Sequence, residues 1–229
     1  MTSLQKWGKS VRTTIPVMAG YLVLGAGFGI LLRTRGYGLG WALAMSTFIY
    51  AGSMQYVAID LLTGGASLLT TAVTTLLVNA RHLFYGVSML ERYRAAGKYA
   101  PYLIFSLTDE TYSLVAARED LTGAECFRIS LLDQLYWVLG TALGSLAGAY
   151  LRFDTTGIDF SLTALFLTVF TEQWLDTKDH APALIGLGVS IVCRLLFGAD
   201  SFLLPTMGAM LCCLLVLDGR RMKKGGESA

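Results

Sequence analysis

The sequence GASLLTTAVTTLLVNARHLFYGVSML, residues 65–90, is an apolar stretch long enough to cross a bilayer as a helix. It carries Asn79, Arg81 and His82 near its middle. An arginine at the centre of a membrane helix costs roughly 2.5–3.5 kcal/mol on insertion scales. A chain that places these side chains at this depth therefore needs an interior cavity or a polar partner to receive them.

The composition around this stretch is that of a membrane protein. Only 15% of the 229 residues are charged and 54% are apolar, with a mean hydropathy of +0.56. A typical soluble domain has about 25% charged residues. Residues 15–32 and 36–57 carry no charge at all. We therefore predict an all-α polytopic membrane protein, a single membrane domain over residues 1–229, because helices satisfy their own backbone polar groups in a bilayer.

Eight apolar stretches follow one another, at residues 14–32, 41–62, 67–90, 101–117, 129–151, 160–175, 181–198 and 202–217. The second contains YAGSMQ, residues 50–55, whose glycine and small polar residues at mid-depth predict an interrupted helix. Such backbone is tolerated in a membrane only where it lines a cavity. Gly25 and Gly29 in the first stretch, and Gly140, Gly144 and Gly148 in the fifth, predict close helix crossings.

The two halves of the chain, residues 14–98 and 127–200, resemble each other in the order of their motifs. The matched positions are Gly25 with Gly140, Gly29 with Gly144, Gln55 with Gln173 and Arg81 with Arg194. Chance similarity among apolar helices is the alternative explanation. The order and spacing predict an internal repeat.

The distribution of lysine and arginine predicts the topology. If the second and sixth stretches are re-entrant, most cations lie on the side of the N-terminus, including those of residues 92–98 and of the basic tail 219–229, and Arg118 and Arg128 lie opposite. If all eight stretches cross the membrane, the excess of lysine and arginine on the side of the N-terminus becomes smaller. The positive-inside rule therefore favours about six spans plus two re-entrant or broken helices, with the halves inverted and both termini cytoplasmic. The sixth stretch has no glycine or proline to break it, which argues against its re-entrance.

The ionisable residues within these stretches are the candidate site, because such residues in membrane segments mark transport or proton pathways. Asp109 and Glu110 can pair with Arg81 or bind an ammonium group or a proton; the alternatives are a structural salt bridge and an interfacial position. Arg81 can clamp a carboxylate. The N–H groups near Gly52 can bind an anion, and the alternative is a glycine needed for a helix crossing. His82 can carry protons or simply hydrogen-bond a neighbouring helix.

The candidate residues fall into three sets. The substrate-binding set is Gly52, Ser53, Gln55, Asn79, Arg81 and Asp109. The proton-coupling set is Glu110, His82 and Asp109. The polar residues of the second half are Glu172, Gln173 and Arg194, although Glu172 beside Trp174 is also compatible with an interfacial position.

Other function classes find little support. The chain has no phosphate-binding loop of the G-x-x-x-x-G-K-[ST] type. It has only two histidines, and its four cysteines follow no metal or disulfide spacing, so we expect no metal, no cofactor and no enzyme activity. A membrane hydrolase using Ser53 with His82 lacks any signature, and a scaffold that transports nothing is the other alternative.

Four motifs together resemble the AzlC family, also called the YgaZ type. They are YAGSMQ at 50–55, NARH at 79–82, TDE at 108–110, and the segment from Asp159-Phe160 through Ala164-Leu165-Phe166 to Glu172-Gln173. The resemblance spans roughly residues 14–198. These proteins are the large subunits of two-component branched-chain amino acid exporters.

The resemblance implies secondary-active export of leucine, isoleucine, valine and often methionine across the bacterial inner membrane. It also implies a small hydrophobic partner subunit of the AzlD or YgaH type. Combined with the ionisable residues, it predicts an exporter driven by proton antiport. The alternative is a transporter of another small amphipathic substrate.

Overall fold

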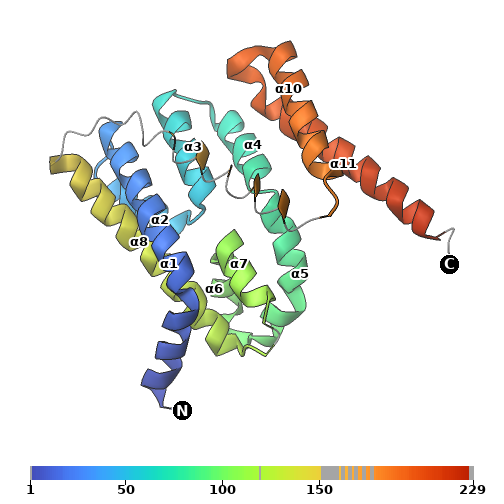
Figure 1. The fold of residues 1–229 in the computed structure, drawn as a ribbon. Coiled ribbons are helices and arrows are strands. Elements are labelled where there is room, and N and C mark those ends of the chain that lie inside the picture. The colour runs from blue at the N-terminus through green and yellow to red at the C-terminus, as the bar shows by residue number, and fades with distance from the viewer. Residues whose placement is uncertain are drawn as a thin grey trace. The chain divides into compact units, whose positions relative to one another are not determined.

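The computed structural model of the chain describes residues 2–118, 120–150, 160, 163–164, 167, 170–171, 174–175 and 178–226. The described residues form helices, turns and loops, and no strand occurs among them (Figure 1). The chain divides into two compact units, Met1–Leu162 and Thr163–Ala229. The all-helical prediction is confirmed for the described residues.

The first unit is built from a long helix at each end and three interrupted pairs between them. The long helices are α1 (Ser3–Thr34) and α8 (Gly123–Tyr150). The pairs are α2 (Leu39–Phe48) with α3 (Gly52–Thr63), α4 (Leu68–Val78) with α5 (Arg81–Ala95), and α6 (Ala100–Phe105) with α7 (Asp109–Ala116). A 3-10 turn, η1 (Gly97–Tyr99), joins α5 to α6.

Helices α1 and α8 pack along each other at very short range (Figure 1). A Cβ on Gly25 would lie 2.9 Å from the carbonyl oxygen of Trp137, and one on Gly140 would lie 2.8 Å from that of Tyr21. A Cβ on Gly144 would overlap the backbone of Ala26. The close crossings predicted from the two glycine patterns are therefore confirmed, and they are a single interface.

The two helices run in the same direction. At the end where α1 begins, which we call the Ser3 end, Lys9 contacts Glu125 at 3.5 Å. At the other end, the Thr34 end, a Cβ on Gly148 would lie 3.2 Å from the Cβ of Arg33. The prediction that the first and fifth spans are inverted relative to each other is wrong, because their like ends meet.

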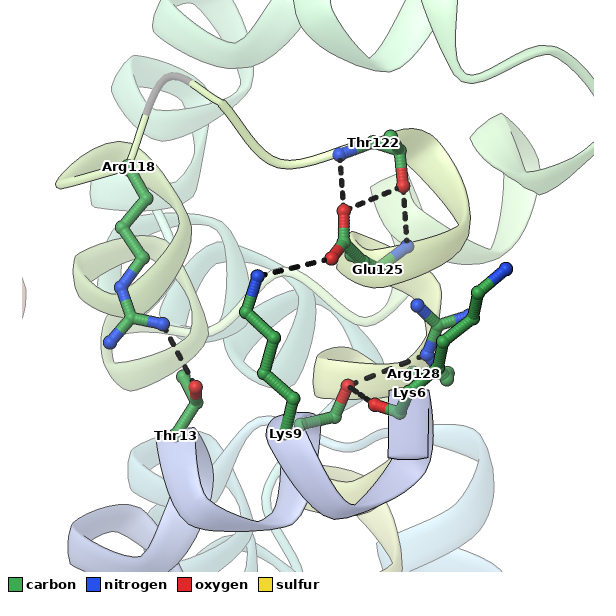
Figure 2. A network of polar contacts seen from close by, with 8 residues as sticks. Lys6, Lys9, Thr13, Arg118, Thr122, Glu125 and Arg128 are labelled. Carbon is green, nitrogen blue, oxygen red and sulfur yellow. Dashed lines mark hydrogen bonds and ion pairs between the residues drawn. The ribbon is translucent and has the colours of Figure 1, made fainter. Parts of the chain in front are cut away.

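Polar contacts at the Ser3 end connect the start of α1 with the residues that lead into α8 (Figure 2). Arg118 donates to the Thr13 hydroxyl at 2.8 Å, and Arg128 donates to Ser10 at 3.4 Å. The predicted placement of Arg118 and Arg128 opposite the N-terminus is therefore also wrong.

Helices α2 and α3 form a hairpin that enters from the Thr34 end and returns to it. Tyr50, between them, has φ of 42°, and Ala51 has φ −134° with ψ 89°, so the chain reverses. Gln55 of α3 donates to Ser46 of α2 across the hairpin at 3.2 Å. The interruption predicted within residues 50–55 is confirmed, and the pair has the shape expected of a re-entrant element.

Helices α4 and α5 are an interrupted helix that continues in one direction. Asn79 and Ala80 keep dihedral angles close to helical, φ −93° with ψ 4° and φ −53° with ψ −33°, so the axis is offset rather than reversed. Helix α4 begins close to the end of α3. Helix α5 ends at the Ser3 end, where Arg92 donates to the carbonyl oxygens of Val115 and Arg118. The pair therefore joins the two ends of the unit.

Helices α6 and α7 form a second hairpin, which enters from the Ser3 end. Tyr102 of α6 reaches Gln134 in the middle of α8, and α7 returns alongside α5 to Arg118. Thr108 is extended and caps α7 by accepting from the Thr111 N–H. The prediction that residues 101–117 cross the membrane is not met, because this capped reversal brings both ends to one side.

The two hairpins thus enter from opposite ends and meet at mid-height, where the ring of Tyr50 lies 6.5 Å from that of Phe105. The order of a long element followed by a hairpin occurs twice with opposite direction: α1 with α2–α3, then α4–α5 with α6–α7. The predicted repeat of residues 14–98 with residues 127–200 is not confirmed.

The second unit contains α10 (Ala181–Ser201) and α11 (Leu203–Gly226), which pack together. Gly198 has φ of 74° and breaks α10 near its end. Among the described residues, Ser3–Thr34 and Ala181–Gly198 are the helices long and apolar enough to cross a bilayer. The interrupted pairs fail this length test because each half is short.

Candidate functional site

Three helix starts come together where the hairpins meet, those of α3, α5 and α7. Arg81, the first residue of α5, links the other two. Its Nη2 donates to the Ser53 hydroxyl at 2.7 Å, and its Nη1 lies 2.7 Å from Oδ2 of Asp109. Arg81 thus pairs with Asp109, one of the two acids considered as its partner from the sequence, and also contacts the start of α3.

The Arg81–Asp109 ion pair is incompletely satisfied. Nε of Arg81 and Oδ1 of Asp109 are buried and have no hydrogen-bond partner among the residues that the structure describes. The side chains are 32% and 27% exposed. Buried polar groups are normally paired, so the unused donor of Arg81 and the unused acceptor of Asp109 are candidates for contacts with a ligand.

A cavity of about 470 Å³ lies between the tip of the α2–α3 hairpin, α5 and α6; Arg81 and Asp109 are not among its lining residues, whereas His82, which follows Arg81 in the sequence, is. Most of its wall is apolar, with Ile49, Leu90, Ile104, Phe105 and Leu107 among the lining residues. Small-molecule sites typically occupy about 300–1,000 Å³ and combine such walls with a few polar groups.

Asn79 and His82 supply polar groups to the cavity wall. The Nδ1 atom of His82 lies 3.2 Å from the carbonyl oxygen of Asn79, at the offset between α4 and α5. The offset thus turns the neighbours of Arg81 towards the cavity.

Glu110 lies next to Asp109 in sequence but has different contacts. Its Oε2 accepts a hydrogen bond of 2.6 Å from the Tyr21 hydroxyl of α1, which also lies 2.7 Å from the Thr108 hydroxyl. The two acids at the start of α7 are therefore divided between an arginine and a tyrosine.

Gln55 and Gly52 lie behind the site. Gln55 is fully buried, accepts from Trp137 Nε1 at 2.8 Å and donates to Ser46. A Cβ on Gly52 would lie 3.1 Å from the Trp137 ring. These two predicted residues hold the hairpin against α8 and do not line the cavity.

The residues predicted in the second half belong to the second unit. Glu172 and Gln173 lie outside the described residues. Arg194 belongs to the second unit, where its guanidinium lies 5.5 Å from the centre of the Phe202 ring. No three His, Cys, Asp or Glu side chains in the described part of the chain lie close enough to bind a metal ion together.

Asp133 is a polar residue at the site that the sequence interpretation left out. It is fully buried, and its Oδ2 accepts from the Thr111 hydroxyl at 2.9 Å. Ile129, Asp133 and Trp137 are four residues apart and all buried. This helical spacing was the available signal, because it places Asp133 on the same face as two core residues.

Comparison with known proteins gives the family. The family model described as AzlC protein matches residues 16–151, which is more than half of the chain. The chain belongs to the AzlC family. It is 46% identical over 209 residues to the "Branched-chain amino acid transport protein AzlC" of Bacillus subtilis, covering 89% of this chain and 82% of that protein.

Other relatives carry less specific names. An "Uncharacterized membrane protein" of Helicobacter pylori is 43% identical over 207 residues, covering 89% of this chain and 91% of that protein. The "Inner membrane protein YgaZ" of Escherichia coli is 27% identical over 168 residues, covering 69% of each chain. No solved structure matches this chain. The AzlC match covers the whole first unit apart from the start of α1 and the residues after α8.

Proposed function

We propose that this chain is the transport subunit of a proton-coupled exporter of branched-chain amino acids in the bacterial inner membrane. The observations that carry the proposal are the incompletely satisfied Arg81–Asp109 pair and a largely apolar cavity whose wall includes His82, the residue that follows Arg81. The name of the B. subtilis relative supports the substrate class.

The ion pair suits the polar half of an amino acid. A guanidinium binds a carboxylate through two parallel hydrogen bonds, and Arg81 Nε and Nη atoms lie on one edge of the group. Asp109 Oδ1 can accept from the substrate ammonium. A zwitterion placed there would satisfy the two buried atoms that lack partners.

The cavity suits the apolar half. A leucine, isoleucine, valine or methionine side chain gains about 1.5–3 kcal/mol when it is fully buried in an apolar site. Ile104, Phe105 and Leu107 offer such surface. A charged or small polar side chain gains nothing comparable from it, so the cavity favours apolar amino acids.

Glu110 is the proton carrier in this proposal, with Asp109 and His82 as further candidates. Glu110 is neutral when it is protonated and negatively charged after it has released its proton. Its protonation state therefore alters the electric field at the neighbouring Arg81–Asp109 pair. Export is then driven by the return of a proton. A small AzlD-type subunit is included as the partner on the strength of family resemblance.

Counterflow in proteoliposomes tests the proposal. The purified full chain is reconstituted with and without a small AzlD-type subunit, loaded with unlabelled leucine, and exposed to labelled amino acids in turn. We expect exchange of leucine, isoleucine, valine and methionine, and little of lysine or glutamate. Exchange of a different substrate class would overturn the substrate assignment, and no exchange with either preparation would favour a scaffold.

A further inference from the structure

Asp133 is a buried carboxyl that the proposed function does not use. Its side chain is fully buried on α8, and Oδ1 has no hydrogen-bond partner among the described residues. Lys9 and Arg81 form their ion pairs with other carboxylates, those of Glu125 and Asp109. A buried carboxylate without a cation costs several kcal/mol, so its protonation state requires an explanation.

A continuous row of hydroxyl groups joins Asp133 to Glu110. The Glu110 carboxyl lies 2.6 Å from the Tyr21 hydroxyl, which lies 2.7 Å from that of Thr108. Thr108 lies 3.1 Å from the Thr111 hydroxyl, which lies 2.9 Å from the carboxyl of Asp133. Helices α1, α7 and α8 each contribute to the row, so its geometry depends on tertiary packing.

The number of hydrogens decides the charge of this row. Its four contacts need four hydrogens, and the three hydroxyl groups supply three. If both carboxyls are ionised, one contact at 2.6–3.1 Å joins two oxygens with no hydrogen between them. One proton on either carboxyl completes the row, and two protons leave one too many.

We propose that Glu110 and Asp133 share one proton through the hydroxyl groups of Tyr21, Thr108 and Thr111, which makes Asp133 a second proton-binding residue of the transporter. This inference rests on the proposed function, because it extends the coupling role of Glu110. It assigns Asp133 as the inner store of the proton and Glu110 as the outlet at the substrate site.

Proton transfer along the row balances without any further reactant. When Glu110 is protonated, each group donates to the next towards Asp133. On transfer the O–H bond of Glu110 breaks, each hydroxyl accepts one proton and releases its own, and an O–H bond forms on Asp133. No net charge leaves the row, so the step only moves the negative charge from Asp133 to Glu110.

Other titratable groups face the row. Tyr50 and Tyr102 interact electrostatically with Asp133. His82 and Tyr85 of α5, together with Tyr50, do so with Glu110. The negative charge on Glu110 lies next to Asp109, so its arrival weakens the hold of Asp109 on Arg81 and favours exchange of substrate.

Thr111→Val tests the inference, because valine has the shape of threonine without the hydroxyl. Exchange of leucine in counterflow needs no proton release, whereas leucine flux driven by a pH gradient does. We expect Thr111→Val to lower the pH-driven flux by roughly 10²-fold, the lower end of what a positioned proton donor contributes, and to leave counterflow close to that of the wild type.

Two variants control for structural damage. Thr111→Ser restores the hydroxyl and should restore the pH-driven flux. Thr141→Val removes another buried hydroxyl, which accepts from Ser46 outside the row, and should leave both fluxes unchanged. If Thr111→Val keeps the pH-driven flux, or loses both fluxes equally, the inference is wrong.

Infrared spectroscopy provides a readout that does not depend on transport. At neutral pH the purified chain should show the C=O stretch of a protonated carboxyl, and the Glu110→Gln/Asp133→Asn double variant should lack it. Absence of the band in the wild type, or its persistence in the double variant, overturns the shared proton. Failure of wild-type counterflow with the band present would instead overturn only the proposed substrate.

Discussion

Among the described residues other than glycine, Tyr50 is the one with a positive φ. Its φ of 42° puts a bulky side chain in the left-handed region, at a cost of about 1–2 kcal/mol. The ring is 4% exposed, lies near Phe105 and lines the cavity. Packing of the ring therefore holds the hairpin tip in a strained conformation next to the candidate site, where such strain is commonly found.

The strain can be measured by comparing Tyr50→Gly with Tyr50→Ala. Both variants lose the ring, but only glycine adopts positive φ without a steric penalty. We expect the glycine variant to be the more stable of the two by about 1 kcal/mol, seen as a higher unfolding midpoint of the detergent-solubilised protein. Equal stability of the two variants would mean that the tip relaxes once the ring is gone.

The Arg81–Asp109 pair can be separated into structural and transport roles by a double-mutant cycle. Arg81→Ala and Asp109→Ala each leave a partly buried charge without its partner, and we expect each to cost about 1–3 kcal/mol of stability because solvent screens part of the loss. The double variant should recover most of this stability. Leucine counterflow should be lost in all three.

The same cycle distinguishes the pair from a structural salt bridge. A double variant that is stable and still exchanges leucine would remove the pair from the substrate site. Ser88→Ala, which removes exposed contacts to the Tyr112 hydroxyl and the Tyr85 carbonyl oxygen on the same two helices, is the matched control and should keep both properties.

At the scale of helices, the interruptions within the pairs α2–α3, α4–α5 and α6–α7 differ in how clearly the sequence predicts them. The break before Gly52 follows from glycine and small polar residues. The offset at Asn79 has no glycine or proline and was not predictable by breaker residues. The break before Asp109 carried a readable signal, since a threonine followed by two acids is typical of a helix start. Within an apolar run this signal was outweighed by hydropathy.

The close packing of α1 against α8 predicts that a larger residue at Gly144 destabilises the protein. The Cβ of Gly144→Ala would lie within 2.6 Å of Ala26 backbone atoms and forces the helices apart. We expect a loss of roughly 1–3 kcal/mol in unfolding free energy. Gly20→Ala on the same pair of helices meets nothing within 4 Å and should be neutral or stabilising. A similar loss in both variants would indicate helix flexibility rather than close packing.

At the scale of the whole molecule, contacts at the Ser3 end change the assignment of lysine and arginine residues to the two sides of the membrane. Cations from three separate segments gather there: Lys6, Lys9, Arg12, Arg92, Arg94, Lys98, Arg118 and Arg128. The Thr34 end has Arg33 and Arg35. The positive-inside rule correctly grouped residues 92–98 with the N-terminus, and it favours a cytoplasmic Ser3 end.

The sequence alone could not show whether residues 101–117 cross the membrane. Their length is at the lower limit for a crossing helix, and hydropathy does not detect a reversal of the chain. Assigning this stretch as a crossing moved Arg118 and Arg128 to the wrong end and inverted the fifth span. A single missed hairpin therefore reversed the predicted direction of α8. Tertiary contacts, such as that of Arg118 with Thr13, were needed to correct it.

Cysteine accessibility in intact cells tests this topology. Lys98→Cys, Arg118→Cys and Arg35→Cys are placed singly in a chain whose native cysteines are replaced by serine; all three positions are exposed. We expect a membrane-impermeant thiol reagent added outside to label only Arg35→Cys, and to label the other two after permeabilisation. Because Lys98 and Arg118 flank the α6–α7 hairpin, labelling of one but not the other in intact cells would mean that residues 101–117 cross the membrane, and the two hairpins could then not meet at the site.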